Sequence, residues 1–268
     1  MGKIIAVANQ KGGVGKTTTC VNLTCALKKR GRRVLLVDCD PQGNSTSGMG
    51  VDKTSTPNCY DMLMNGAAAA DCIHSTKYGD VLPANMNLSG CSVELVGSEQ
   101  REYIMKTALA AVQDDYDFIL IDCPPSLGLL TVNALTAADY LLIPTMAETF
   151  AASGITQLYD TYKSVKKYTN PALRIDGVLL TRTERTRVTK TIQELTEKIA
   201  DYMGADVYRT TIRSNVIIKE AQAVQENVFD YIESKAQTKG ERVSEASRNF
   251  VNDCLNFVKE FVEKEREQ

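Results

Sequence analysis

Histidine and closely paired cysteines are almost absent from this sequence. The 268 residues include one histidine, His74, and none of the eight cysteines forms a C-x-x-C pair. The spacing typical of zinc sites is therefore missing. Cys39 and Cys123 lie inside the apolar strand patterns "VLLVDCD" and "FILIDCPP". We therefore predict buried, reduced thiols, as is typical of cytosolic proteins.

Long apolar segments are also missing. No run of about 18 or more apolar residues occurs, so no membrane span is predicted. The opening "MGKIIAVANQ" lacks a small-residue cleavage site and reads as a first strand rather than a signal peptide. The chain ends in "VEKEREQ", whose carboxylates would not favour an anionic lipid surface. We expect a cytoplasmic protein with no membrane partner.

Charge of one sign is not in excess over the whole chain. The net charge is −2, which excludes a uniformly basic nucleic-acid-binding protein. The distribution is uneven, because residues 160–220 hold 12 Lys and Arg against 8 Asp and Glu. This segment is therefore the candidate for contact with an anionic partner.

Strand and helix patterns alternate along most of the chain. Apolar runs typical of buried strands occur at 3–9, 32–40, 116–125, 138–145 and 173–183. Helical patterns lie between them, near 98–113, 128–137, 150–167 and 188–203. This alternation predicts an α/β fold with a mostly parallel sheet covered by helices on both faces.

The domain organisation also follows from these patterns. Residues 44–97 read as loops and short helices attached to the sheet. No Pro/Gly-rich linker and no internal repeat interrupts the chain, so we expect a single domain over residues 1–268. The end of the chain predicts an amphipathic helix at about 241–264 that packs on this domain.

The stretch "NQKGGVGKTT", residues 9–18, contains most of a phosphate-binding P-loop, G-x-x-x-x-G-K-[ST]. Gly15, Lys16 and Thr17 fill the end of the pattern, whereas Gln10 occupies the place of its first glycine. A strand pattern precedes the loop and a helical pattern follows it, which is the context that a P-loop needs. An additional lysine, Lys11, stands near the start of the loop.

The residue types in this loop predict how phosphate would be held. The glycines let the backbone approach phosphate closely, and the freed N–H groups together with the helix N-terminus form an anion cradle. Lys16 would contact the β- and γ-phosphates, the Thr17 hydroxyl would ligate Mg²⁺, and Thr18 would add a hydroxyl donor.

Acidic residues follow two of the predicted strands. Asp38 and Asp40 end "RRVLLVDCD", and Asp122 ends "YDFILID". Carboxylates at the carboxyl ends of parallel strands are where Mg²⁺ and the attacking water are held in such sites. We interpret Asp40 and Asp122 as residues that take part in this chemistry. Asp38 is either a structural cap for the loop or a further functional residue.

Four motifs together carry a family resemblance. "KGGVGKTT", "VDCDPQGN", "LIDCPPSLGLLTVNAL" and "IPTMAETFAASGI" resemble the ParA/Soj family of partition ATPases, within the deviant Walker A (MinD/ParA) class of P-loop NTPases. The similarity runs from Lys3 to about Ala221. "DPQGN" is the most specific of these motifs, because the related MinD-type ATPases share the P-loop but lack it.

The resemblance implies roles for individual residues. Lys11 would reach the phosphates bound by a second subunit, so that ATP becomes part of the interface of an ATP-dependent homodimer. Asp40 would position the attacking water, and Asp122, with Asp40 as a possible second residue, would hold Mg²⁺ through water. The implied catalytic residues are Asp40, Lys11 and Lys16. The implied nucleotide-binding residues are Lys11, Gly12, Gly13, Val14, Gly15, Lys16, Thr17, Thr18 and Glu148. One departure is Met146, since members usually have Gln two positions before that Glu.

The resemblance also implies nonspecific DNA binding by the ATP dimer and stimulation of ATP hydrolysis by a ParB-like protein, in a cytoplasmic, nucleoid-associated setting. The candidate DNA-binding residues are Arg182, Arg185, Arg187, Lys190, Arg213 and Lys219. The family often reads P-R-N-V-R-L-S-E-A where this chain has "IRSNVIIKEA", so Ile217 stands where an arginine is often found. No helix-turn-helix precedes the P-loop, which argues against operator recognition.

Two alternative functions stay open at this point. The first is a ParA-like positioning factor for another cargo, which would act through protein contacts without DNA. The second is an iron–sulfur relative with the same P-loop, for which Cys123 and Cys91 would be the candidate ligands. The sequence does not identify the cargo as a chromosome, a plasmid or an integrated element.

Overall fold

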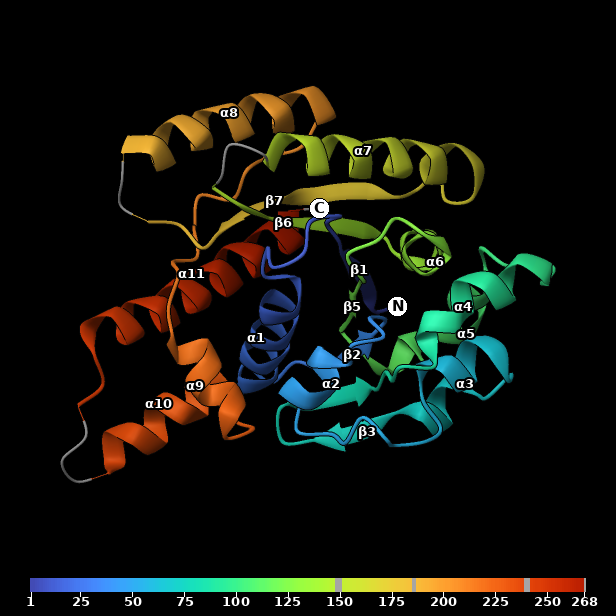
Figure 1. Cartoon of the computed structure of the whole chain (residues 1–268), viewed down its shortest axis with the longest axis horizontal. Coiled ribbons are helices and arrows are strands. Elements are labelled where there is room, and N and C mark those ends of the chain that lie inside the picture. Colours follow the sequence, from blue (N-terminus) through green and yellow to red (C-terminus); the bar gives the residue numbers. More distant parts are fainter. Residues whose placement is uncertain (148–150, 185–186, 239–241, 268) are drawn as a thin grey trace.

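The computed structural model describes residues 1–147, 151–184, 187–238 and 242–267, with the backbone alone for 151–153, 187–190 and 267. The described residues form one seven-stranded sheet in the order β3-β4-β2-β5-β1-β6-β7 (Figure 1). The strands are β1 (Lys3–Val7), β2 (Val34–Asp38), β3 (His74–Thr76), β4 (Gly79–Leu82), β5 (Phe118–Asp122), β6 (Tyr140–Met146) and β7 (Arg174–Thr181).

All strand pairs of this sheet are parallel except β3 with β4. The predicted α/β fold with a mostly parallel sheet is therefore confirmed. The prediction for residues 44–97 was incomplete, because this segment also supplies the two strands β3 and β4. They form one edge of the sheet, where three- and four-residue strands leave no apolar alternation in the sequence.

Helices cover both faces of the sheet (Figure 1). On one face lie α3 (Cys59–Met64), α4 (Leu88–Glu94), α5 (Ile104–Ala110), α6 (Leu129–Ala137), α7 (Ala151–Tyr168) and α8 (Arg187–Met203), and on the other lie α1 (Lys16–Lys29), α9 (Ile217–Ala223), α10 (Val228–Gln237) and α11 (Glu245–Glu267). The short helix α2 (Asn44–Gly48) follows β2. The helix that was expected near 98–113 is shorter, since α5 covers only Ile104–Ala110.

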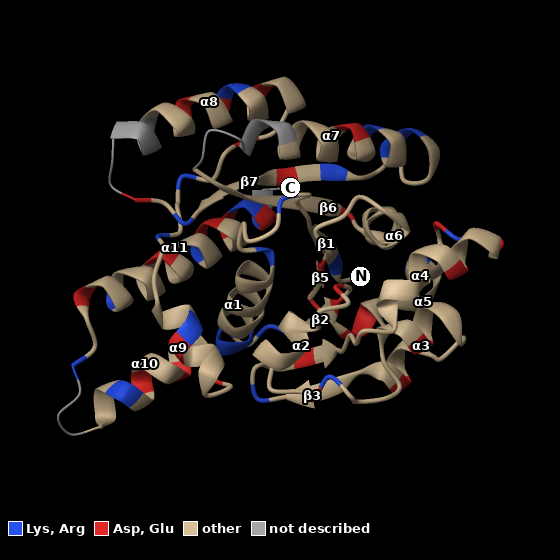
Figure 2. Ribbon diagram, viewed as in Figure 1, with Lys and Arg blue, Asp and Glu red and all other residues tan. Residues whose placement is uncertain are grey.

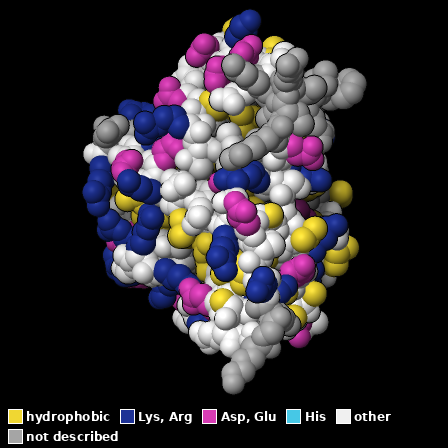
Figure 3. Space-filling model, turned by 90° about the vertical axis from the view of Figure 1, so that its left-hand side faces the viewer, with side chains coloured by type: hydrophobic (Ala, Val, Ile, Leu, Met, Phe, Trp, Pro, Cys, Tyr) yellow, Lys and Arg dark blue, Asp and Glu magenta, His cyan; other side chains and the backbone are white. Residues whose placement is uncertain are grey.

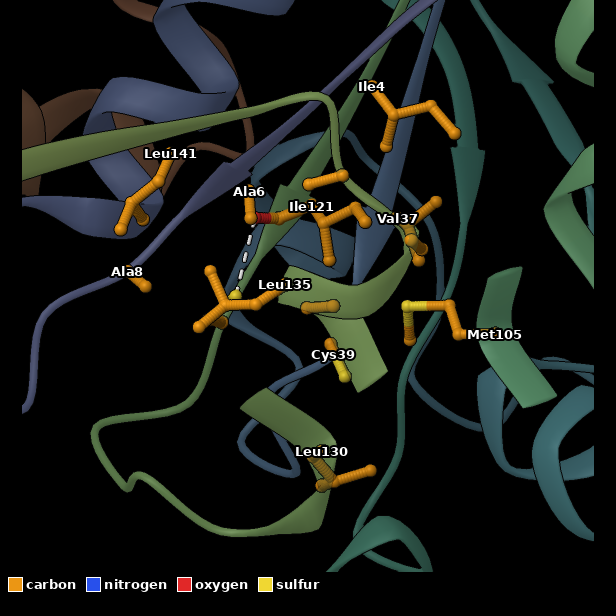
Figure 4. Close-up of a cluster of buried hydrophobic side chains, with 14 of the residues drawn as sticks. Ile4, Ala6, Ala8, Val37, Cys39, Met105, Ile121, Leu130, Leu135 and Leu141 are labelled. Carbon is orange, nitrogen blue, oxygen red and sulfur yellow. Dashed lines mark hydrogen bonds between the residues drawn. The ribbon is translucent and has the colours of Figure 1, made fainter. Parts of the chain in front are cut away.

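Alternate residues of each central strand enter two separate cores. On β1, Ile4 and Ala6 point to the core shared with α5 and α6, where they meet Ile121 and Leu135 (Figure 4). Ile5 and Val7 belong to the core on the α1 and α11 side. Because both faces of these strands are buried, the strands read as continuous apolar runs.

The C-terminal helix α11 packs on the domain through an aromatic stripe. Phe250, Phe257 and Phe261 are buried, and the Phe261 ring centroid lies 5.7 Å from that of Phe118 on β5. The helix spans Glu245–Glu267, whereas the sequence predicted about 241–264, of which 241 lies outside the described residues. None of the described helices combines the length and the apolar character that crossing a membrane requires.

The parallel pairing brings the carboxyl ends of six strands to one edge of the sheet. Val7 of β1 is in register with Asp122 of β5, and Asp38 of β2 is in register with the same residue. The segments that follow β1, β2, β4, β5, β6 and β7 therefore leave the sheet at this carboxyl edge, where α/β proteins bind their ligands.

Candidate functional site

The segment that follows β1 has the backbone of an anion-binding loop. Gly13 and Gly15 take left-handed conformations with φ of 75° and 87°, and α1 begins directly afterwards at Lys16. The carbonyl of Val14 accepts a hydrogen bond of 2.7 Å from the Thr181 hydroxyl at the end of β7. The backbone thus has the predicted P-loop geometry, and the Thr181 hydrogen bond holds the loop against the end of β7.

The Lys16 side chain reaches the backbone at the start of the loop. The ammonium of Lys16 donates to the backbone carbonyl of Lys11 at 3.3 Å. Lys16 is buried, and this burial lowers its pKa, while the nearby carboxylate of Asp122 acts in the opposite direction. A desolvated ammonium held over a cradle of N–H groups is an electrostatic site for phosphate.

Asp122 at the end of β5 organises the hydroxyl groups beside the loop. Its Oδ2 accepts hydrogen bonds of 2.7 Å from the Thr17 hydroxyl and of 2.7 Å from the Ser45 hydroxyl. Its Oδ1 is buried without a hydrogen-bond partner among the described residues. A buried carboxylate oxygen without a partner, beside two hydroxyls, fits a hydrated Mg²⁺ ion. Burial raises the pKa of Asp122, and the two hydroxyl donors oppose that effect.

Asp38 and Asp40 have different environments at the end of β2. Asp38 is fully buried and accepts from the backbone N–H and the hydroxyl of Thr46, each at 2.7 Å, and from the backbone N–H of Asp40 at 3.1 Å. These bonds support the structural-cap interpretation of Asp38. Asp40 is also buried, and its Oδ1 accepts from the Gln42 backbone N–H at 3.0 Å.

Asn9 fixes the start of the loop, a role that no sequence motif indicates. Its side-chain amide donates to the Pro144 carbonyl of β6 at 2.8 Å, and its Oδ1 accepts from the Lys11 backbone N–H at 3.0 Å. A Cβ atom at Gly154 of α7 would lie 3.3 Å from that Oδ1, so the close packing there favours glycine. Asn9 therefore ties the backbone that carries Lys11 to β6.

A pocket of about 770 Å³ adjoins the loop on the side of β7. Its walls come from the P-loop, the first turns of α1, residues 212–222 and α11, and it includes Gly15, Thr18, Asn22, Asn215 and Val216. The volume lies in the range of small-molecule sites. Thr18 thus lies at the pocket as well as at the loop.

The candidate DNA-binding residues do not form one open basic surface among the described residues. Arg213 makes a bidentate ion pair with Asp253 of α11, with two N···O distances of 2.8 Å. Arg182 lies at the P-loop, where its guanidinium is 3.5 Å from the Gly13 carbonyl. Ile217 is buried in the core, and Lys219 is exposed. Lys and Arg are interspersed with Asp and Glu along α9, α10 and α11 (Figure 2). Residues of both charges also occur together on the face seen in Figure 3.

Some predicted residues lie outside the described part of the chain. These are Glu148 and Arg185, together with the side chains of Arg187 and Lys190, whose backbone begins α8.

The cysteines do not form a metal site in the described structure. All eight are buried and free, which confirms the prediction of buried thiols. The Cys123 thiol donates to the Ile121 carbonyl at 3.8 Å. Within the described residues, no group of three or more His, Cys, Asp and Glu side chains is arranged to hold a metal ion.

The strand, glycine-rich loop and helix, with Lys16 over the loop and Asp122 beside Thr17, define a P-loop nucleotide-binding protein. A domain family described as "AAA domain" matches residues 2–175. The sporulation initiation inhibitor protein Soj of Bacillus subtilis is 50% identical over 224 residues, which are 82% of this chain and 88% of that protein. The chain belongs to the ParA/Soj family of partition ATPases.

Solved structures show the same fold. Cobyrinic acid a,c-diamide synthase from Mycobacterium smegmatis, with a bound ATP analogue and magnesium, is 36% identical at a TM-score of 0.75, covering 91% of this chain and 98% of that one. A plasmid partition protein from Borrelia burgdorferi bound to AMPPNP is 25% identical at a TM-score of 0.79, covering 98% of this chain and 100% of that one.

Proposed function

We propose that this protein binds ATP with Mg²⁺ and hydrolyses it slowly to ADP and phosphate, in a cycle that attaches it to DNA and releases it. The observation that carries the proposal is the cluster of Thr17, Ser45 and Asp122 beside the P-loop, in which Oδ1 of Asp122 has no hydrogen-bond partner among the residues that the structure describes. Similar proteins bind ATP analogues and, in one case, magnesium.

The residues of the site divide the chemistry between them. The P-loop N–H groups and Lys16 bind the phosphates, Asp122 would hold a hydrated Mg²⁺ ion beside the Thr17 hydroxyl, and that ion would supply positive charge for the triphosphate. Asp40 orients the water that attacks the γ-phosphorus as the bond to the bridging oxygen breaks. The proton of that water leaves with the phosphate product. Asp40 is buried, with 9% of its surface exposed, and follows β2 at the carboxyl edge of the sheet.

In this proposal, Lys11 supplies the contact that joins two subunits across the bound ATP. ATP carries about four negative charges, which a second protein face would meet unfavourably unless it brought a cation. Asn9 holds the Lys11 backbone at the start of the loop, which supports a fixed origin for this lysine. The ammonium of each subunit would then contact the triphosphate of the other, and hydrolysis would weaken the dimer.

The DNA partner rests on the basic segment and on the family. Lys219 is exposed, and residues 185–190 add cations that lie outside the described side chains. Two such segments in a dimer would bind phosphates of any sequence, and a ParB-like protein would stimulate hydrolysis and release. The protein would then be nucleoid-associated in the cytoplasm, and the cargo is a DNA element.

A salt titration of fluorescent duplex DNA tests this function. Wild-type protein with ATP and Mg²⁺ should bind unrelated duplexes with similar affinity, and log K should fall linearly with log salt. The Lys16→Ala variant, which lacks the phosphate contact, should bind DNA no better with ATP than without it. Absence of binding by wild-type protein with ATP at about 50 mM salt would reject the DNA partner. The protein-only positioning factor would then be the better function.

A further inference from the structure

Arg182 follows β7 directly and is held over the P-loop. Its backbone is left-handed, with φ of 51°, a conformation that costs a side chain such as arginine some strain. Its Nη1 lies 3.5 Å from the Gly13 carbonyl, and a Cβ atom at Gly13 would lie 3.8 Å from the same nitrogen. The exposed guanidinium is therefore directed along the surface of the loop, and Arg182 forms no ion pair within the described residues.

The same guanidinium lines the pocket of about 770 Å³ beside the P-loop. Gly13, Gly15 and Thr18 contribute to this pocket, whereas Asp40 and Asp122, on the magnesium side of the loop, are not among its described lining residues. A nucleotide with its β- and γ-phosphates on the loop therefore has room for its ribose and base on the Arg182 side.

The pocket lacks an exposed aromatic ring for a base among its described residues. Its two phenylalanines, Phe250 and Phe257, are 0% and 3% exposed because they belong to the core. Two guanidinium groups line the pocket, and a guanidinium stacks on aromatic faces far better than an ammonium does. That of Arg213 is held in its bidentate pair with Asp253, whereas that of Arg182 forms no ion pair among the described residues. Val216 also lines the pocket and is 67% exposed, an apolar surface that the core does not use.

We propose that Arg182 is a nucleotide-binding residue whose guanidinium stacks on the base of the bound nucleotide, with Val216 as an apolar contact for the same base. The proposal rests on the ATP binding proposed above and removes Arg182 from the set of DNA contacts. The Thr181 hydroxyl bond to Val14 fixes the end of β7 against the loop, so the stacking group and the phosphate cradle keep a constant separation. Stacking accepts any purine, so Arg182 contributes affinity without choosing between adenine and guanine.

Calorimetric titration with two ligands tests this assignment. ATP has the base, whereas inorganic tripolyphosphate has only the phosphate chain, and both are titrated in the presence of Mg²⁺. Arg182→Ala should weaken ATP binding roughly 3- to 30-fold and leave tripolyphosphate binding unchanged. Arg182→Lys, which keeps the charge and loses the plane, should also weaken ATP binding. Arg209→Ala is the matched control, because Arg209 is an exposed arginine of the same segment that does not line this pocket.

The outcomes separate three roles of Arg182. Unchanged ATP affinity in Arg182→Ala overturns the proposal, and a lower salt slope for DNA would then assign the residue to DNA. Equal losses for ATP and tripolyphosphate overturn it in favour of a phosphate contact. If Arg182→Ala is not folded by circular dichroism, Arg182→Asn, which tolerates the left-handed backbone, takes its place. The readouts involve neither DNA nor hydrolysis, so wild-type protein that binds ATP but not DNA would reject only the DNA partner of the proposed function.

Discussion

The hydroxyl of Thr17 and the carboxylate of Asp122 lie 2.7 Å apart, although 105 positions separate them in the chain. The contact follows from the parallel pairing of β1 with β5, which puts Val7 and Asp122 in register. Thr17 is the second residue of α1 and ends the P-loop pattern, so the same pairing that builds the central sheet places its hydroxyl beside the Asp122 carboxylate.

Asp122→Ala should therefore impair magnesium-dependent ATP binding. The substitution removes the acceptor of both Thr17 and Ser45 and the oxygen that holds the hydration shell, so ATP affinity in Mg²⁺ should fall about 10- to 100-fold. ATP titrations with Mg²⁺ and with a chelator measure this effect. The affinity in chelator is the control and should match that of wild-type protein. An unchanged Mg²⁺ dependence would show that Asp122 does not hold the metal.

Asp40→Ala should separate binding from hydrolysis. The phosphate contacts of the P-loop and Lys16 remain, but the attacking water loses the group that orients it. ATP affinity should stay within about threefold of wild type while the hydrolysis rate falls at least about 100-fold. Phosphate release under saturating ATP is the measurement. Gln42→Ala, next to this site, is the control for disturbance of the loop, and normal turnover in Asp40→Ala would remove Asp40 from the mechanism.

The two lysines of the P-loop should give different defects. Lys16→Ala should lose most nucleotide affinity, because Lys16 contacts the phosphates bound by its own loop. Lys11→Ala should retain ATP binding in the monomer but fail to dimerise, because its ammonium serves the partner subunit. Light scattering with ATP and Mg²⁺ decides between these results. A dimer of normal stability in Lys11→Ala would contradict the contact across the interface.

The sequence predicted the parts of the site that depend on motif and strand end. The glycine-rich loop, Lys16, Thr17 and Asp122 lie together because parallel strands end at one edge, a rule that needs no side-chain detail. Ser45, Asn9 and Thr181 escaped prediction, since their roles come from tertiary contacts. Thr181 reaches Val14 across 167 positions, and no local pattern indicates that pairing.

Charge patterning was a weaker guide than strand patterning. The excess of Lys and Arg in 160–220 predicted a basic surface, yet Arg213 meets Asp253, which lies 40 positions later on α11. Arg209 similarly pairs with Glu260 of the same helix. The net charge of a segment does not show whether acidic residues on another helix neutralise its arginines. The short strands β3 and β4 were not predicted for a related reason. Their local sequence pattern is weak, and pairing with each other and with β2 stabilises them.

The Arg213–Asp253 pair should contribute to stability. The Asp253 side chain is 10% exposed, so Arg213→Ala leaves a carboxylate nearly buried without its bidentate partner. We expect a loss of about 1–3 kcal/mol in the free energy of unfolding. A double-mutant cycle with Asp253→Ala, followed by urea unfolding, measures the coupling. Additive single effects would show that the pair contributes nothing, and a DNA defect in Arg213→Ala is interpretable only after this correction.

Asp176 should make stability depend on pH. It is fully buried on β7, and its carboxylate accepts from the Tyr208 hydroxyl, while the Lys264 ammonium donates to its backbone carbonyl. Burial raises the pKa of Asp176 from 3.8 to about 6, and Tyr208 and Lys264 oppose that effect. A carboxyl with a raised pKa in the folded state binds its proton more tightly there. Its stabilisation is therefore complete below the unfolded pKa and is lost as the pH rises through about 6.

Asp176→Asn should remove most of the loss of stability that ionisation of Asp176 causes as the pH rises. The amide oxygen still accepts from Tyr208, and the amide carries no charge to bury. The wild-type free energy of unfolding should decline by up to about 3 kcal/mol more than that of the variant between about pH 4 and pH 8. Urea unfolding at each pH measures it. Glu265, whose pKa burial also raises and which pairs with Lys3, keeps part of the slope in the variant. Asp206→Asn is the matched control, since the Asp206 side chain is 83% exposed and pairs with the same Lys264. Parallel curves for wild type and Asp176→Asn would show that Asp176 does not set the pH dependence.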